Sequence, residues 1–229
     1  MSADFDILTF DCYGTLIDWE GGITTAFSSL GKQIGQEISP ERVLQLHARI
    51  EPEVQAESFQ RYREVLDLTA ARIAGELGLE IPGDLSHFLS ESLSRWQPFP
   101  DTGPALESLR GAGYRLGILS NVDDDLLAGT LEHLPVNFEL LVTAEQVGSY
   151  KPALGHFREA GRQIGDSSWL HVAQSFFHDV QPAVALHLPA VWINRKNESP
   201  LSAARPQAEF PDMASFAKHR VERSASVGS

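Results

Sequence analysis

The sequence has little cysteine, few basic residues and no long hydrophobic run. Cys12 is the only cysteine among 229 residues, so no disulfide can form within the chain. The 18 Lys and Arg residues stand against 31 Asp and Glu residues, which gives a formal net charge of −13. This surplus of acid disfavours nucleic acid or an anionic membrane as a partner. No stretch approaches the roughly 18 apolar residues that a membrane-spanning helix needs.

The composition and the amino terminus are those of a globular protein. Hydrophobic residues make up 42% of the chain, which is enough to bury a core. The first residues, MSADFDIL, lack the basic start and the long apolar segment of a secretion signal. Together with the lone thiol, this start predicts a cytoplasmic protein. The length fits either two domains or one domain with a large insertion.

Short apolar runs alternate with helical patterns through most of the chain. The first run, FDILTF, is rich in strand-forming residues and nearly continuous in hydrophobicity, as expected for a strand covered on both faces. Strands separated by helices pair in parallel through right-handed crossovers. The sequence therefore predicts an α/β fold with a doubly wound, Rossmann-like parallel sheet. Its strands are expected at residues 5–10, 114–119, 138–143, 169–173 and 190–194.

The segment after the first strand carries helical signals instead of strands. Ser39 followed by Pro40 is a typical helix start. Apolar residues spaced by three and four predict a helix over 57–79, closed by Gly78, and a shorter helix is expected over 86–96. We therefore expect a helical cap domain inserted into the α/β core. The predicted division is a core at 1–17 and 98–215, a cap at 18–97 and a loose tail at 216–229.

Chemically useful side chains follow the predicted strands. In open α/β sheets, ligands bind outside the carboxyl ends of the strands. Taken singly, each of these residues has an ordinary interpretation as a turn, a helix cap or a solvated surface charge. Their gathering at one edge of one sheet instead predicts a functional site. They are Asp11 after the first strand, Ser120 and Asn121 after the second, Lys151 in the loop after the third, and His178 and Asp179 beyond the fourth.

Four short motifs, in this order, resemble those of the haloacid dehalogenase superfamily of hydrolases. They are DCYGT at 11–15, LSN at 119–121, KP at 151–152, and HD at 178–179 followed by VWINR. The resemblance covers nearly the whole chain and implies a Rossmann-like core with a small helical cap. It also implies that Asp11 is a catalytic nucleophile. Ser120 and Lys151 would bind the reacting group, and Asp179 would position the site.

Tyr13 distinguishes two reactions within this superfamily. Its phosphatases usually carry a second Asp two residues after the nucleophile, which protonates the leaving alcohol. Tyr13 stands at that position, and a phenol with a pKa of about 10 is a poor acid for the task. Halide leaves without a proton, and YGTL resembles the L-2-haloacid dehalogenase (type II) branch. The resemblance implies hydrolysis of short 2-haloalkanoic acids through an Asp11 ester, giving 2-hydroxy acids with inversion and requiring no cofactor or metal.

A small anionic substrate needs further polar contacts near the nucleophile. The candidates for substrate binding are Tyr13, Thr15, Asn121, Ser175 and Arg49. Arg49 is included because dehalogenases of this branch hold the halide partly with an Arg of the cap. His47, Arg61 and Arg63 remain alternatives for that role. Solvated surface charge is the plain interpretation of all four.

Two other functions stay open. A magnesium-dependent phosphatase would bind Mg²⁺ through Asp11 and Asp179. A binding protein could have kept the scaffold without turnover, although it would need none of the polar residues as a set. The apolar and aromatic residues of the cap could serve a homodimer or only cover the core.

Overall fold

In this computed structural model, which describes residues 5–227 and their side chains up to residue 224, six parallel strands form one sheet. The strands are β1 (Ile7–Phe10), β2 (Arg115–Ser120), β3 (Leu140–Thr143), β4 (Trp169–Ala173), β5 (Ala190–Ile193) and β6 (Ala208–Phe210). Their order across the sheet is β3-β2-β1-β4-β5-β6, so the predicted doubly wound α/β fold is confirmed. Sequence analysis missed β6, a three-residue edge strand that lies in a polar stretch.

β1 lies near the centre of the sheet, between β2 and β4. All four of its residues are buried, as expected for a strand with helices on both faces. Phe10 is level with Ile118 of β2 and with Val172 of β4. The three strands therefore deliver the residues that follow them to one point on the carboxyl edge of the sheet.

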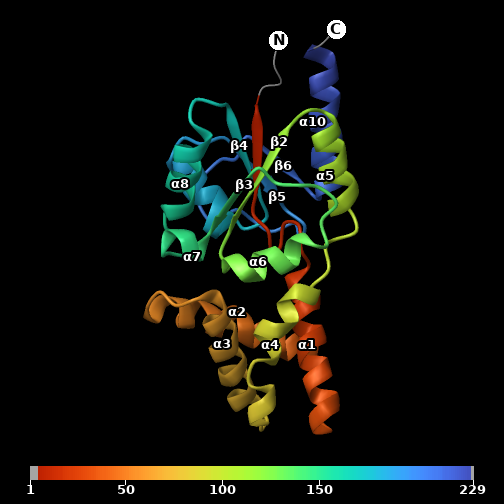
Figure 1. Ribbon diagram of the computed structural model, residues 1–229, viewed down its shortest axis with the longest axis vertical. Helices are drawn as coiled ribbons and strands as arrows, with labels where there is room; N and C mark the ends of the chain where they lie inside the picture. Colours follow the sequence, from red (N-terminus) through yellow and green to blue (C-terminus); the bar gives the residue numbers. More distant parts are fainter. Residues whose placement is uncertain (1–4, 228–229) are drawn as a thin grey trace.

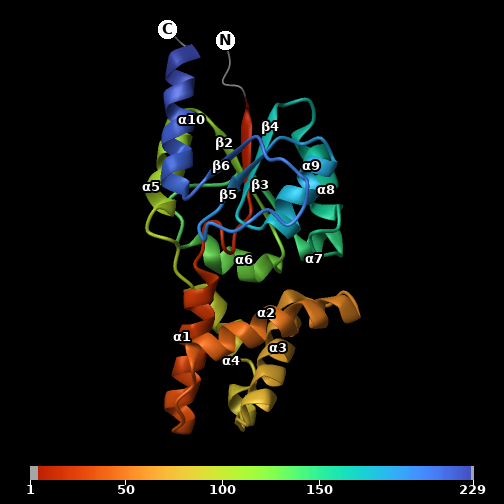
Figure 2. The ribbon, with the colours of Figure 1, turned by 180° about the vertical axis from the view of Figure 1, so that it is seen from behind.

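Helices cover both faces of the sheet. α5 (Thr102–Gly111) and α10 (Met213–Val227) lie side by side on one face (Figures 1 and 2). α8 (Gly155–Ile164) and α9 (Gln181–Ala185) lie on the other face, and α7 (Ala144–Val147) packs against α8. Within residues 5–227, no helix is both long and apolar enough to cross a membrane.

Four helices gather beyond the carboxyl ends of the strands (Figure 1). They are α1 (Trp19–Ile34), α2 (Pro40–Glu57), α3 (Tyr62–Leu77) and α4 (Phe88–Ser92), with 3-10 turns at Gly83–Leu85 and Leu93–Arg95. α6 (Asp124–Leu131) lies between this group and the sheet. The helix start predicted at Ser39 is confirmed, because its hydroxyl accepts a hydrogen bond from the backbone N–H of Arg42.

The helix predicted over 57–79 is not continuous in the structure. α2 ends at Glu57, and α3 begins only at Tyr62. The reason is a contact from the core. The buried carboxylate of Asp123 accepts the backbone N–H groups of Tyr62 at 2.8 Å and Arg63 at 2.9 Å. Asp123 thereby caps the first turn of α3, and no periodicity within 57–79 could reveal so distant a residue.

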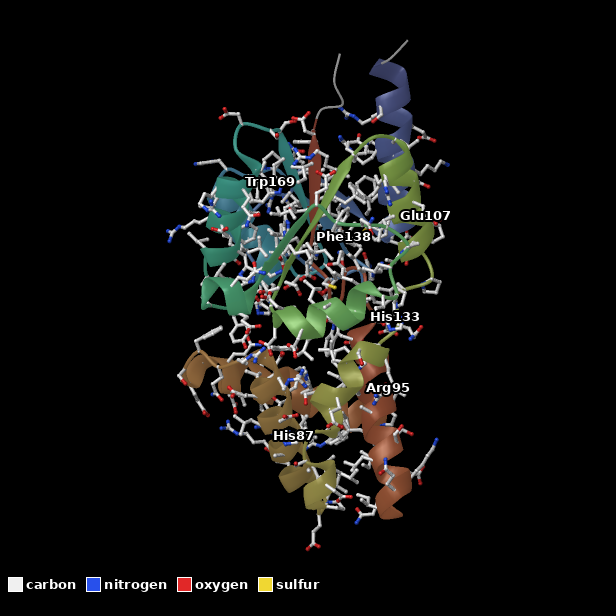
Figure 3. All side chains as sticks on the ribbon, in the orientation of Figure 1. His87, Arg95, Glu107, His133, Phe138 and Trp169 are labelled. Carbon is white, nitrogen blue, oxygen red and sulfur yellow. The ribbon has the colours of Figure 1, made fainter. Side chains whose placement is uncertain are left out.

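We propose that residues 18–97 form the cap domain, because the chain leaves and re-enters the core side by side. The N–H of Asp18 donates to the carbonyl of Gln97 at 2.9 Å, and the N–H of Phe99 donates to the carbonyl of Leu16 at 3.0 Å. A third contact lies near the end of α6, where His133 Nε2 donates to the carbonyl of Ser94 at 2.7 Å (Figure 3). These two linker segments lie side by side and connect the cap to the core.

The tail expected to be loose from residue 216 is helical through Val227, so this expectation is wrong for the described residues. Met213, Phe216 and Ala217 are buried at helical spacing and belong to the main hydrophobic core. The polar residues that suggested a loose end, such as Lys218 and His219, occupy the exposed side of α10. Residues 228–229 of the expected tail lie outside the described part of the chain.

We expect Phe216→Ala to lower the free energy of unfolding by about 3–5 kcal/mol, because it deletes a fully buried ring and leaves a cavity. Urea denaturation followed by circular dichroism measures the change. Lys218→Ala, on the exposed side of the same helix, is the control and should shift it by less than about 0.5 kcal/mol. Equal stability of the two variants would contradict the docking of α10.

Candidate active site

Asp11 lies directly after β1, at the start of a tight turn. Its backbone N–H donates to the carbonyl of Val172, which continues the ladder with β4 for one more residue. Gly14 then adopts a φ of +97°, a backbone conformation that residues with a Cβ rarely adopt. A Cβ at Gly14 would also lie 3.1 Å from Gln174 Oε1 and 3.3 Å from Trp19 Nε1. The turn therefore favours glycine mainly for its conformation, and a Cβ would also be tightly packed there.

Lys151 joins the two acidic residues of the site. Its Nζ donates to Asp11 Oδ1 at 2.9 Å and to Asp179 Oδ1 at 2.6 Å. The third proton goes to the carbonyl of Leu119 at 2.8 Å. An ammonium group has three protons, so the hydrogen-bonding capacity of Lys151 is filled. Its side chain is 1% exposed, which makes this an ion cluster of one cation and two carboxylates in the interior.

The three charges shift one another's pKa in a low-dielectric environment. Burial raises the pKa of Asp11, Lys151 opposes the rise, and the carboxylate of Asp179 adds to it, so that the pKa lies above the ordinary range. Burial also raises the pKa of Asp179, but Lys151 and His171 outweigh it and hold that pKa well below its ordinary range. Burial lowers the pKa of Lys151, yet the two carboxylates reverse this effect and raise it. Asp11 is thus the more easily protonated of the two acids.

Thr15 is hydrogen-bonded to the carboxylate of Asp11 and lies behind it. Its hydroxyl donates to Asp11 Oδ2 at 2.8 Å and accepts the backbone N–H of Gln174 at 2.8 Å. Thr15 is fully buried and does not line the cavity beside Asp11. The Asp11 carboxylate is therefore fixed through both oxygens, and we propose that Thr15 orients it instead of contacting a substrate.

A chain of hydrogen bonds behind Asp179 escaped the sequence analysis. Trp169 Nε1 donates to Thr9 Oγ1 at 2.6 Å, and that hydroxyl lies 2.9 Å from His171 Nδ1. His171 Nε2 donates to Asp179 Oδ1 at 3.0 Å. In the neutral imidazole every bond then runs in one direction, from the indole toward the carboxylate. Figure 3 shows Trp169 on the sheet, away from the cap helices.

A cavity of about 260 Å³ opens beside these acids. On the core side it is lined by Asp11, Tyr13, Ser120, Asn121, Lys151, Gln174, Ser175, His178 and Asp179. Seven of the nine predicted site residues line the cavity. An eighth, Thr15, donates a hydrogen bond to Asp11. Arg49 is the exception.

The core residues at the cavity differ in how many of their hydrogen-bonding atoms lack a partner. Ser120 Oγ is buried and has no hydrogen-bond partner within the described structure. Asn121 is occupied, because its amide exchanges two hydrogen bonds with the backbone of Lys151. Ser175 Oγ accepts the backbone N–H of His178 and lies 3.0 Å from His178 Nδ1. Ser120 thus has a free hydroxyl, whereas Asn121 and Ser175 shape the loops around it.

Tyr13 is engaged away from the reacting acids. Its hydroxyl lies 2.8 Å from Thr130 Oγ1, and its ring packs edge-on against Trp96. Burial raises the pKa of Tyr13 well above its ordinary value. The phenol is therefore an even poorer proton donor here than in water.

The structure does not bring Arg49 to the cavity. Its guanidinium is half exposed on α2 and pairs with Glu76 of α3. The alternatives Arg61 and Arg63 also point elsewhere, since both form ion pairs with Asp125 of α6. His47, the fourth alternative, does line the cavity.

The cap side of the cavity comes mainly from α2, through residues that the sequence analysis missed or left undecided. His47, Glu51 and Gln55 line it, at four-residue intervals that place them on one helix face. Trp19 and Tyr62 complete the cap side. A polar stripe running alongside the buried apolar stripe of α2 was the signal that could have identified this face.

Comparisons with known proteins identify the family. A family model of haloacid dehalogenase-like hydrolases matches residues 5–183. The chain belongs to the haloacid dehalogenase-like hydrolases. The resemblance expected from the four motifs is thereby confirmed.

Several relatives of this hydrolase are dehalogenases. An (S)-2-haloacid dehalogenase of Pseudomonas putida is 29% identical over 53% of this chain and 55% of the relative, so the chain spans about half the length of that protein. Haloacetate dehalogenase H-2 of Moraxella sp. (strain B) is 27% identical over 83% of this chain and 86% of its own. A glyceraldehyde 3-phosphate phosphatase of Methanothermobacter thermautotrophicus is 26% identical over 81% and 84%. The solved L-2-haloacid dehalogenase of Xanthobacter autotrophicus shares the fold, with a TM-score of 0.79 at 18% identity, covering 93% of this chain and 97% of that one.

Lys151 and Thr15 occupy most of the core-side carboxylate oxygens at the cavity that a magnesium ion could bind. Asp11 Oδ1 and Asp179 Oδ1 both accept from Lys151, and Asp11 Oδ2 accepts from Thr15. Only Asp179 Oδ2 lacks a partner among the described residues. No group of three or more His, Cys, Asp or Glu side chains within residues 5–224 is arranged to hold a metal. Mg²⁺ usually binds through one or two carboxylates and keeps several waters, and here Lys151 competes with it for both acids.

We expect Lys151→Met to destabilise the hydrolase by about 3–5 kcal/mol near neutral pH, because it leaves two carboxylates facing each other in the interior. Without the cation their folded-state pKa values rise above the unfolded ones. The stability contribution of such an acid is complete below the unfolded pKa and is lost as pH rises through the folded pKa.

The deficit should therefore be smaller at pH 5 than at pH 8, which urea denaturation at the two pH values measures. Lys196→Met is the matched control, since Lys196 pairs with Glu20 at the exposed surface and its loss should cost less than about 1 kcal/mol at either pH. A deficit that does not depend on pH would contradict the electrostatic role of Lys151.

Proposed function

We propose that this hydrolase dehalogenates short 2-haloalkanoic acids through an ester of Asp11 and releases the 2-hydroxy acid with inversion. The observation that carries the proposal is the oriented Asp11 carboxylate beside a cavity in which Tyr13, with a raised pKa and an engaged hydroxyl, occupies the place of a proton donor. A leaving halide needs no proton, whereas a leaving alcohol does. The dehalogenases among the relatives support the same class of reaction.

The first step is a displacement at carbon 2. One carboxylate oxygen of Asp11 forms a bond to that carbon while the carbon–halogen bond breaks, and the halide leaves with the bonding electrons. Thr15 and Lys151 hold the carboxylate in one orientation, which removes the entropy cost of aligning it for attack. Attack from the side opposite the halogen inverts the carbon.

The second step is hydrolysis of the ester. Water attacks Cγ of Asp11, and the bond between Cγ and the ester oxygen breaks. The 2-hydroxy acid leaves with that oxygen and with one proton of the water. The other proton passes to solvent as Asp11 returns to its carboxylate. Asp179 Oδ2 lines the cavity without a partner and can orient the attacking water by accepting a hydrogen bond from it.

The carboxylate of the substrate would bind on the core side. Ser120 supplies an unpartnered buried hydroxyl, and His178 lies at the same side of the cavity. The proposal requires no cofactor, which fits the dehalogenases among the relatives. A homodimer and a cytoplasmic location stay predictions from the sequence.

Hydrolysis of a phosphate ester has less support, although phosphatases occur among the relatives. It would need a proton for the leaving alcohol and a cation for the phosphate. Tyr13 is a poor acid, and Lys151 is already saturated by three acceptors.

We expect Asp11→Asn to reduce halide release from 2-chloropropanoate by about 10⁴-fold or more, as in other enzymes that lose a covalent nucleophile. Asp166→Asn, an exposed acid, is the matched control and should keep wild-type turnover. A single turnover of excess wild-type enzyme in ¹⁸O-water should leave one heavy oxygen on Asp11, detected by peptide mass spectrometry. Heavy oxygen in the first-turnover product instead would mean that water attacks carbon 2 directly.

We expect kcat/KM for halide release to fall as the pH is lowered, with a midpoint above the ordinary Asp pKa of about 3.9. The nucleophile must be ionised, and burial together with Asp179 raises the pKa of Asp11. The midpoint belongs to the coupled cluster of Asp11, Lys151 and Asp179. Circular dichroism at each pH separates titration from unfolding. A kcat/KM that stays constant below about pH 4 in folded protein would contradict this assignment.

A further inference from the structure

The cap side of the cavity carries a carboxylate and an imidazole, and neither arginine nor lysine lines it within the described structure. Lys151 lies on the core side and already gives all three protons to protein oxygens. A ligand group that reaches the cap therefore meets the side chains of α2 and not a free positive charge.

His47 is the clearest sign that the cap side binds something. It is 2% exposed, lines the cavity and has no hydrogen-bond partner for either ring nitrogen. Leaving buried polar groups unpaired is unfavourable, so such atoms are normally satisfied by a ligand or by water. Its ring packs against Trp19, which fixes its orientation.

The protonation state of His47 determines what it can bind. Burial lowers its pKa, while Glu51 on α2 and Glu20 on α1 oppose this shift. A neutral imidazole offers one donor and one acceptor and carries no charge that would attract an anion.

Glu51 adds a carboxylate one helical turn from His47. It lines the cavity and is half-buried. Its Oε1 accepts from the Tyr62 hydroxyl at 2.9 Å and from Gln55 Nε2 at 3.2 Å, so the carboxylate is held in place. A carboxylate in such a position repels an anion and accepts hydrogen bonds from a donor.

The size of the cavity leaves room for such a donor. A cavity of about 260 Å³ is large enough for several non-hydrogen groups. His47 and Glu51 line its cap side, opposite the core residues beside Asp11.

We propose that the substrate of this hydrolase carries, besides its halogen and carboxylate, a second polar group that donates hydrogen bonds to Glu51 and His47. A hydroxyl or an ammonium group on carbon 3 has this chemistry. The inference rests on the proposed dehalogenation and names a narrower substrate class for the same cavity: short 2-haloacids substituted by a hydrogen-bond donor.

The test compares three substrates of nearly equal shape. 2-Chlorobutanoate ends in a methyl group, 2-chloro-3-hydroxypropanoate ends in a hydroxyl, and 2-chloro-3-aminopropanoate ends in an ammonium group. Halide release gives kcat/KM for each. We expect kcat/KM for one or both donor substrates to exceed kcat/KM for 2-chlorobutanoate by about ten- to a hundredfold. This is the factor that a hydrogen bond to a charged group typically contributes.

Two variants connect the preference to the cap. Glu51→Gln removes the charge but keeps an acceptor for Tyr62, and the ratio of donor to methyl substrate should fall about tenfold or more. Glu53→Gln makes the same change at an exposed position of α2 and should leave the ratio unaltered. A larger effect of Glu51→Gln on the ammonium than on the hydroxyl substrate would identify the cationic donor.

The outcomes separate this inference from the proposed function. Equal kcat/KM for the three substrates of the wild type, with halide released from each, overturns the inference and leaves dehalogenation intact. A preference that survives Glu51→Gln overturns the assignment to Glu51. Absence of halide from every substrate overturns dehalogenation and the inference with it. The wild-type ratios decide the matter even where Glu51→Gln does not fold.

Discussion

The buried contact of Lys151 with Asp11 and Asp179 is the interaction on which the site depends. One ammonium group fixes an oxygen of each acid and donates its last proton to the carbonyl of Leu119 in β2. Bringing three charges out of water is expensive, and their attraction offsets the expense only when the geometry is good and the remaining lone pairs are satisfied. Thr15 and His171 supply that satisfaction for one oxygen of each acid. The cluster therefore exists only where several strands end at one point.

The order of the strands provides that point. β1 lies between β2 and β4, and the registers bring Phe10, Ile118 and Val172 level. The acids and the cation come from three loops far apart in sequence, yet each loop leaves the same edge of the sheet. The cap then covers this edge, attached by the paired linkers and by Asp123, whose carboxylate caps α3. Asp123 lies in the same loop after β2 as Asn121, so the segment that supplies Ser120 and Asn121 to the cavity also contacts the cap.

Features that depend on neighbouring residues could be predicted from the sequence, whereas those that depend on contacts between residues far apart in the sequence could not. The strands were predictable because a buried parallel strand is a short, continuous apolar run, and the site residues were predictable because they follow those runs. The break before Tyr62 was not, since its cause is a carboxylate 61 positions away. The contact of His171 with Asp179 was not predictable either, because a histidine within an apolar strand does not indicate which acid it will contact. α10 was missed because its polar end outweighed the three apolar residues that dock it.

The contrast between the two sides of the cavity follows from the same constraint. On the core side, Asp11, Lys151 and Asp179 bond to one another and leave only Asp179 Oδ2 without a partner among the described atoms of these three side chains. We propose that Ser120 on the core side and His47 on α2, whose buried polar atoms also lack partners, contact the substrate. The core loops are restricted by their shared cluster, but α2 is a surface helix whose polar stripe can change without disturbing it. We therefore propose that, in this architecture, the strand ends determine the chemistry and one face of α2 determines the choice of substrate.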